Sequence, residues 1–75
     1  MTYGEKAVGL TFNPGGNPDV DMLKRKFAEV IDVMDELRMT ARMAGNDEQA
    51  RLASIAITEA QGAQMWAVKA VTWRV

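Results

Sequence analysis

The stretch of residues 52–73, LASIAITEAQGAQMWAVKAVTW, constrains the fold of this chain more than any other segment. Its alanines recur at helical spacing, which draws a stripe of small side chains along one face of a helix. The stripe consists of Ala56, Ala60, Ala63, Ala67 and Ala70. Large apolar residues flank it, and they are Leu52, Ile55, Ile57, Met65, Trp66, Val68, Val71 and Trp73. A helix that is apolar nearly all the way round is normally buried on every side. One partner helix cannot cover it, so the chain is predicted to assemble with copies of itself.

The length and composition support this prediction. A chain of 75 residues makes one small domain, and such a domain usually needs an additional source of stability. Histidine and cysteine are absent, which excludes disulfides and the usual zinc ligand sets. Self-assembly is the remaining route to a sufficient core.

The charge balance limits the classes of partner. The 9 basic and 10 acidic residues give a formal net charge of -1, so no overall field attracts a nucleic acid polymer. The apolar runs are interrupted, as at Lys69, and no secretion signal precedes them. We therefore expect no nucleic acid partner, no membrane partner and no export by that route.

A first long helix is predicted to begin at Pro18. Asn17 can cap its free N–H groups, and proline loses nothing at the first helical position. Gly45 is the natural end of this helix. Its apolar positions follow a three-and-four rhythm that predicts one buried face. They are Val20, Leu23, Phe27, Val30, Ile31, Met34, Leu37 and Ala41.

A second long helix is predicted over residues 47–73, with Asn46 and Gln49 as its capping pair. Two helices of equal length joined by a short turn form an antiparallel hairpin. The fold class is therefore all-α, a two-helix hairpin domain over residues 17–75. Residues 1–16 are expected to form an extended N-terminal arm, because apolar residues alternate at Val8, Leu10 and Phe12 before a turn.

Three neighbouring cations, Lys24, Arg25 and Lys26, lie early in the first long helix. A basic cluster gains nothing from the helix dipole at that position, so a phosphate ligand is one explanation. The other is charge balance with the acidic residues at three- and four-residue spacings. Those residues are Asp19, Asp21 and Glu29. Lys69, which follows Trp66 on an apolar face, either extends into solvent or meets a bound anion.

Carboxylates on the first helix leave a hydrolase alternative open. Helical carboxylates at such spacing hold Mg²⁺ in some nucleotide pyrophosphatases. Here they are Glu29, Asp32, Asp35 and Glu36. Those enzymes need further carboxylates from the facing helix, whereas that helix offers Glu48 at its start and a lone Glu59, so a solvated acidic face is the better interpretation. No nucleophile, paired base or phosphate-cradling loop is evident. We therefore expect a protein that is not an enzyme and that uses no metal and no cofactor.

Two segments carry a resemblance to a known family. FNPGGNPDVDMLKRKFAEVID and RLASIAITEAQGAQMWAVKAV resemble the helical hairpin domain of the bacteriophage anti-CBASS cyclic-nucleotide sponges, a domain shared with the Thoeris anti-defence sponges. The resemblance extends over roughly residues 10–74. It implies a compact homo-oligomer, a hexamer, that acts in the cytoplasm of the infected bacterium. Such proteins sequester cyclic di- and trinucleotide messengers, such as cyclic GMP–AMP, without cleaving them.

The resemblance also implies site residues. An aromatic residue ahead of the first long helix stacks on a base, and Phe12 lies closest to that position. A lysine within the helix meets the phosphates, and Lys24 matches it. With the neighbouring and facing cations, the candidate ligand-binding residues are Phe12, Lys24, Lys26 and Lys69. The alternative is a structural or protein-binding helical oligomer.

Overall fold

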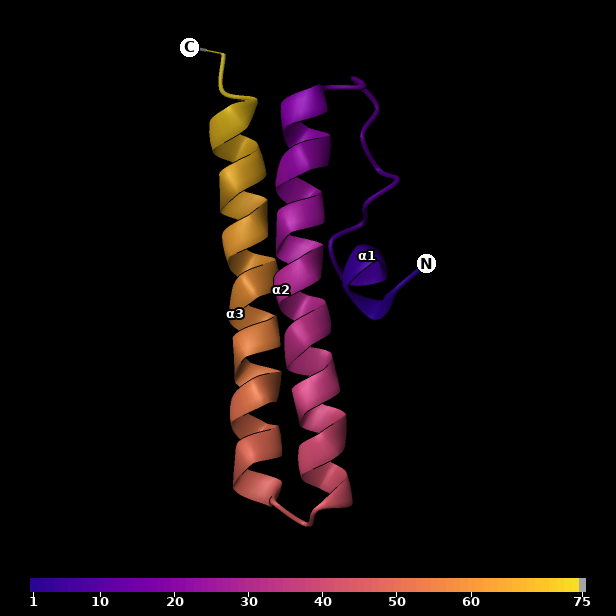
Figure 1. The fold of residues 1–75 in the computed structure, drawn as a ribbon. Helices are drawn as coiled ribbons and strands as arrows, with labels where there is room; N and C mark the ends of the chain where they lie inside the picture. Colours follow the sequence, from indigo (N-terminus) through magenta and orange to yellow (C-terminus); the bar gives the residue numbers. More distant parts are fainter. Residues whose placement is uncertain (75) are drawn as a thin grey trace.

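The computed structural model describes residues 1–74, which form three helices and no strand. The helices are α1, Tyr3–Ala7, α2, Pro18–Met43, and α3, Asp47–Val71. The two long helices lie side by side and antiparallel, and α1 packs against α2 (Figure 1). The start of α2 and the end of α3 therefore lie at the same end of an elongated molecule measuring 48 × 24 × 13 Å. The predicted helical hairpin is confirmed.

Local signals in the sequence determine both ends of α2. The Asn17 side-chain oxygen accepts hydrogen bonds from the backbone N–H groups of Asp19 at 2.8 Å and Val20 at 3.3 Å. At the other end Gly45 has a φ of +73°, a conformation that costs glycine little. The N–H of Asn46 then bonds to the carbonyl of Ala41 at 2.8 Å, which closes a Schellman turn. The predicted bounds of this helix are confirmed.

The start of α3 also agrees with the prediction. The Asn46 side chain accepts a hydrogen bond from the Gln49 N–H at 3.1 Å. The Gln49 side chain contacts the Asn46 side chain at 3.2 Å. The helix ends at Val71, before the predicted end at Trp73, and Thr72 is its C-cap.

The N-terminal arm differs from the prediction, because it carries a short helix in place of an extended segment. Thr2 and Glu5 form a reciprocal capping box at the start of α1, a threonine-to-glutamate spacing that is visible in the sequence. After α1 the chain turns at Gly9, which has a φ of +61°. The alternation of Val8 and Leu10 therefore arises from a turn that buries both side chains.

The core explains why the arm is ordered. Buried side chains from all three parts of the chain meet in one cluster, which contains Val8, Leu10, Ala28, Ile31 and Ile57. The arm therefore covers a part of α2 for which the sequence predicted no partner within the chain. The buried face of α2 is shifted accordingly. Lys24 and Ala28 are buried, whereas Val30, predicted to be buried, is 53 % exposed, and Leu37 is also exposed.

Gly4 is the point at which α1 approaches α2 most closely. Its backbone N–H donates a hydrogen bond to the Asp32 carboxylate at 2.7 Å. A Cβ atom at this position would overlap the carbonyl oxygen of Ala28. Only glycine leaves room for this contact between α1 and α2.

We expect Gly4→Ala to lower the free energy of unfolding by about 1–3 kcal/mol, the usual cost of forcing extra volume into a packed contact. Urea denaturation followed by far-ultraviolet circular dichroism measures it. Gly15→Ala is the matched control, because a Cβ at Gly15 meets no atom within 4 Å. Equal stability of the two variants would show that α1 does not need this close approach.

The outer surface of α3 is apolar and uncovered in the single chain. The helix packs on the rest of the molecule through a face that contains Ala50, Ala53 and Ile57, all buried. On the opposite side the large apolar side chains of Leu52, Ile55 and Trp66 are exposed, and Trp73, which follows the helix, is also exposed. We call these four residues the outer α3 face. No helix within residues 1–74 has both the length and the apolar character needed to cross a membrane.

Candidate functional site

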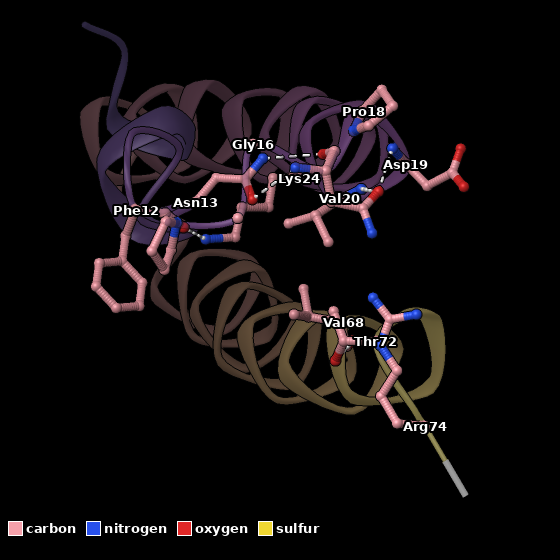
Figure 2. A pocket seen from close by; sticks show the side chains of 13 residues that line it. Phe12, Asn13, Gly16, Pro18, Asp19, Val20, Lys24, Val68, Thr72 and Arg74 are labelled. Carbon is pink, nitrogen blue, oxygen red and sulfur yellow. Dashed lines mark hydrogen bonds between the residues drawn. The ribbon is translucent and has the colours of Figure 1, made fainter.

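A cavity of about 600 Å³ lies at the end of the molecule where the arm, the start of α2 and the end of α3 meet. Its lining comes from residues 12–20 and Lys24 on one side and from Val68, Thr72 and Arg74 on the other (Figure 2). Ligand cavities in proteins commonly fall between about 300 and 1,000 Å³. The two walls come from opposite ends of the sequence, so only the hairpin brings them together.

Lys24 holds the arm against α2. The side chain is only 5 % exposed, and its Nζ donates hydrogen bonds to the carbonyl oxygens of Phe12 at 2.6 Å and Gly9 at 2.9 Å. An ammonium group has three N–H donors. Two of them are therefore committed to the backbone of the arm, and one remains for a ligand at the edge of the cavity.

Phe12 belongs to the lining of the cavity, and its ring points away from the wall that carries Val68, Thr72 and Arg74 (Figure 2). The residue is 74 % exposed, while its carbonyl is fixed by Lys24. The ring centroid lies 5.7 Å from the Lys24 Nζ, within the range of a cation–π contact. The predicted pair of an aromatic ring and a lysine is thus brought together beside one cavity.

The loop between Phe12 and α2 is held by its own hydrogen bonds. The Asn13 side chain donates to the Asn17 carbonyl at 2.9 Å and accepts from the Asn17 N–H at 3.2 Å. Gly16, with a φ of +61°, donates its N–H to the Asn13 carbonyl at 2.9 Å. The start of α2 has its first N–H groups paired with Asn17. Helix N-termini bind anions through free N–H groups, so an anion in this cavity depends on side-chain cations.

The other two candidate residues lie away from the cavity of the single chain. Lys26 is exposed and does not contribute to the lining. Lys69 is also exposed, and its Nζ lies 5.4 Å from the centroid of the Trp66 ring on the outer side of α3. Neither ammonium is brought to Phe12 and Lys24 within one chain.

Two of the four carboxylates that the sequence offers for Mg²⁺ on α2 make structural contacts. Asp32 accepts the hydrogen bond from the N–H of Gly4, and Asp35 pairs with Arg38 at 2.7 Å. Within residues 1–74 the acidic side chains form no group of three that could hold a metal ion. The arrangement does not favour the Mg²⁺-dependent alternative.

Arg38 ties the arm to both long helices. Its guanidinium donates to Asp35 on α2 and to the Ser54 hydroxyl on α3, at 2.7 and 3.3 Å. Its Cζ lies 5.4 Å from the Tyr3 ring centroid. The hydrogen bond to Asp35, and then the contact with Tyr3, raise the pKa of this guanidinium above its ordinary value.

Sequence reasoning missed part of the cavity lining. Thr72 and Arg74 belong to the far end of the chain, and no motif marks them. Asn13 was assigned only to a turn, although its side chain organises the loop. The asparagine at the start of the turn was the available signal, because asparagine side chains commonly hydrogen-bond the nearby backbone in turns.

Comparison with protein families gives one match. The family model "Acb2/Tad1, hairpin domain" matches residues 5–72, which include α2, α3 and most of the arm. A search of curated proteins and a search of solved structures each returned no match. The matched residues span nearly all of the chain, and the two-helix hairpin is the architecture that the family description names. The chain therefore belongs to the Acb2/Tad1 hairpin-domain family.

Proposed function

We propose that this protein is a non-catalytic sponge that binds cyclic di- and trinucleotide immune messengers and withholds them from CBASS-type antiphage signalling. Membership of the Acb2/Tad1 family supports a role in cyclic-nucleotide binding. The place of action is then the cytoplasm of the infected bacterium. Binding without turnover is sufficient for this role, because a messenger held by the protein cannot reach its receptor.

The observation that carries the proposal is the placement of Phe12 and Lys24 at one cavity. An exposed ring can stack on a nucleobase, and such stacking is worth about 1–3 kcal/mol per base. The remaining Lys24 donor can meet a phosphate oxygen through a charge-assisted hydrogen bond. A ligand with bases and phosphates in alternation matches this pair of groups.

The outer α3 face supports self-assembly, and we propose the hexamer that the family resemblance implies. Trp66 is 71 % exposed in the single chain, and Leu52, Ile55 and Trp73 extend the same exposed surface. Large apolar side chains exposed on one side of a helix mark a candidate protein interface. Within a single chain Lys26 and Lys69 lie away from the cavity. In the assembly a neighbouring copy can bring its own Lys26 or Lys69 to a ligand in that cavity.

The same apolar face is the observation in favour of the alternative, a structural or protein-binding oligomer without a nucleotide ligand. The Mg²⁺-dependent hydrolase has less support, because Asp32 and Asp35 already hold Gly4 and Arg38. Recovery of an intact nucleotide from the saturated protein separates the sponge from both alternatives.

We expect cyclic GMP–AMP incubated with the protein and Mg²⁺ to be captured and to return intact after heat denaturation. The reason is that the sequence offers no histidine or cysteine for acid–base or nucleophilic chemistry. Liquid chromatography with mass spectrometry, on both the filtrate before heating and the released fraction, measures capture and integrity.

Phe12→Ala is the informative variant, because loss of the ring should reduce capture without changing the released compound. Met43→Ala is its matched control, since Met43 is 89 % exposed at the opposite end of the hairpin. Linear product would favour the hydrolase, and absence of capture by the parent protein would favour the structural oligomer.

A further inference from the structure

The charged residues of the cavity carry an inference that deepens the proposed function and rests on it. The described lining contains three charged side chains, Asp19, Lys24 and Arg74. The carboxylate and the ammonium cancel in formal charge, so the guanidinium alone makes this lining positive. We infer that Arg74 is the second cationic contact of the site and meets a phosphate group of the cyclic nucleotide.

The position of Arg74 follows from the end of α3. The Thr72 hydroxyl donates to the Val68 carbonyl at 2.8 Å, one turn earlier, which holds the last turn of the helix together. Arg74 follows this cap and lies across the cavity from Asp19, with its guanidinium on the side that faces α2 (Figure 2). The end of α3 thus brings an arginine opposite the loop that carries Phe12.

The guanidinium of Arg74 is available for a ligand within the described part of the chain. The ion pairs recorded among residues 1–74 join Arg25 with Asp21, Arg38 with Asp35 and Arg51 with Glu48. In these residues Arg74 therefore has no carboxylate partner. An arginine fork binds a phosphate through two parallel hydrogen bonds, which a single lysine donor cannot do.

A second cation matters because most of the hydrogen-bond donors of the Lys24 ammonium are committed to the arm. Two of its donors bond to backbone carbonyls, so it can satisfy only one phosphate oxygen. The N–H groups at the start of α2 are paired with Asn17. A cyclic dinucleotide carries two phosphates, and Arg74 is the remaining cation of the lining. Arg74 lies beyond residues 5–72, so the family match does not assign it.

Calorimetry with two ligands tests this inference. Cyclic GMP–AMP has two phosphodiesters, and the linear dinucleotide GpA, without terminal phosphates, has one. We expect Arg74→Gln to weaken cyclic GMP–AMP binding by about tenfold or more, since hydrogen bonds to charged groups contribute roughly 1.5–3 kcal/mol. The loss for GpA should be smaller, so the preference for the two-phosphate ligand should shrink. Asp19→Asn should have the opposite sign and tighten binding.

Arg42→Gln is the matched control, because Arg42 is exposed in the last turn of α2 at the far end of the hairpin. Circular dichroism confirms that each variant is folded. Parent-like binding by Arg74→Gln, or an equal loss in Arg42→Gln, would overturn the role of Arg74 and leave the sponge proposal intact. If the parent bound neither cyclic GMP–AMP nor GpA, the proposed function would be overturned, and this inference with it.

Discussion

Lys24→Met is expected both to destabilise the fold and to abolish nucleotide binding. The substitution leaves the carbonyl oxygen of Phe12 without its donor, while the carbonyl of Gly9 keeps only the backbone N–H of Phe12. A buried polar group that loses its partner costs about 1–3 kcal/mol. The arm should therefore detach from α2, and Phe12 should lose its position beside the cavity.

Thermal denaturation of the variant measures the first effect, because each kcal/mol lowers the Tm of a domain of this size by roughly 4–8 °C. Calorimetry with cyclic GMP–AMP, well below the Tm, measures the second. Lys26→Met is the matched control, since Lys26 is an exposed neighbour with the same side chain. If Lys24→Met were as stable as Lys26→Met, the contacts of Lys24 with the arm would contribute nothing to the stability of the fold.

Lys24 therefore has a larger role than its sequence position indicates. In the sequence it is one of three neighbouring cations early in the first long helix, and the resemblance assigns it to the phosphates of the ligand. In the fold it lies under the arm of its own chain, and only one donor is left for a ligand. A charge reversal at this position would set a carboxylate against two carbonyl oxygens, so loss of binding by that variant alone would not identify a phosphate contact.

Trp66→Glu is expected to convert the oligomer into monomers that remain helical. Burial of a large apolar side chain contributes on the order of 1.5–3 kcal/mol. A carboxylate in an apolar interface also pays the cost of desolvation. Because every copy in a symmetric oligomer carries the substitution, the loss is repeated at each interface. Light scattering after gel filtration, at micromolar concentration, gives the mass.

Met43→Glu is the control for Trp66→Glu, because it adds the same charge to an exposed apolar residue at the tip of the hairpin, away from the outer α3 face. A monomeric parent protein would show that the proposed assembly is wrong. An oligomeric parent whose mass is unchanged by Trp66→Glu would show that a different surface forms the interface.

Helix bounds were predictable because their causes are local. The Asn17 and Pro18 pair starts α2, Gly45 ends it, and Asn46 starts α3, each through contacts within a few residues. The hairpin follows from two such helices and a short turn. The pairing of Phe12 with Lys24 also came from the sequence, through the resemblance of the segments that carry them.

The position of the arm depended on tertiary structure. Its burial rests on Val8 and Leu10 reaching Ile31 and Ile57, and on the absence of a Cβ at Gly4. These contacts join residues that lie far apart in the chain, so no local pattern encodes them. The arm then displaced the predicted buried face of α2 and exposed Val30.

The sequence by itself determined the two helices and the hairpin, because capping and periodicity act over one or two turns. Only the tertiary structure decided that Lys24 clamps the arm and that Arg74 lies across the cavity from Asp19. The physical reason is the antiparallel packing of α2 and α3. It brings the segment that follows α3 to the same end of the molecule as the loop that precedes α2, an arrangement that depends on the whole length of both helices (Figure 1).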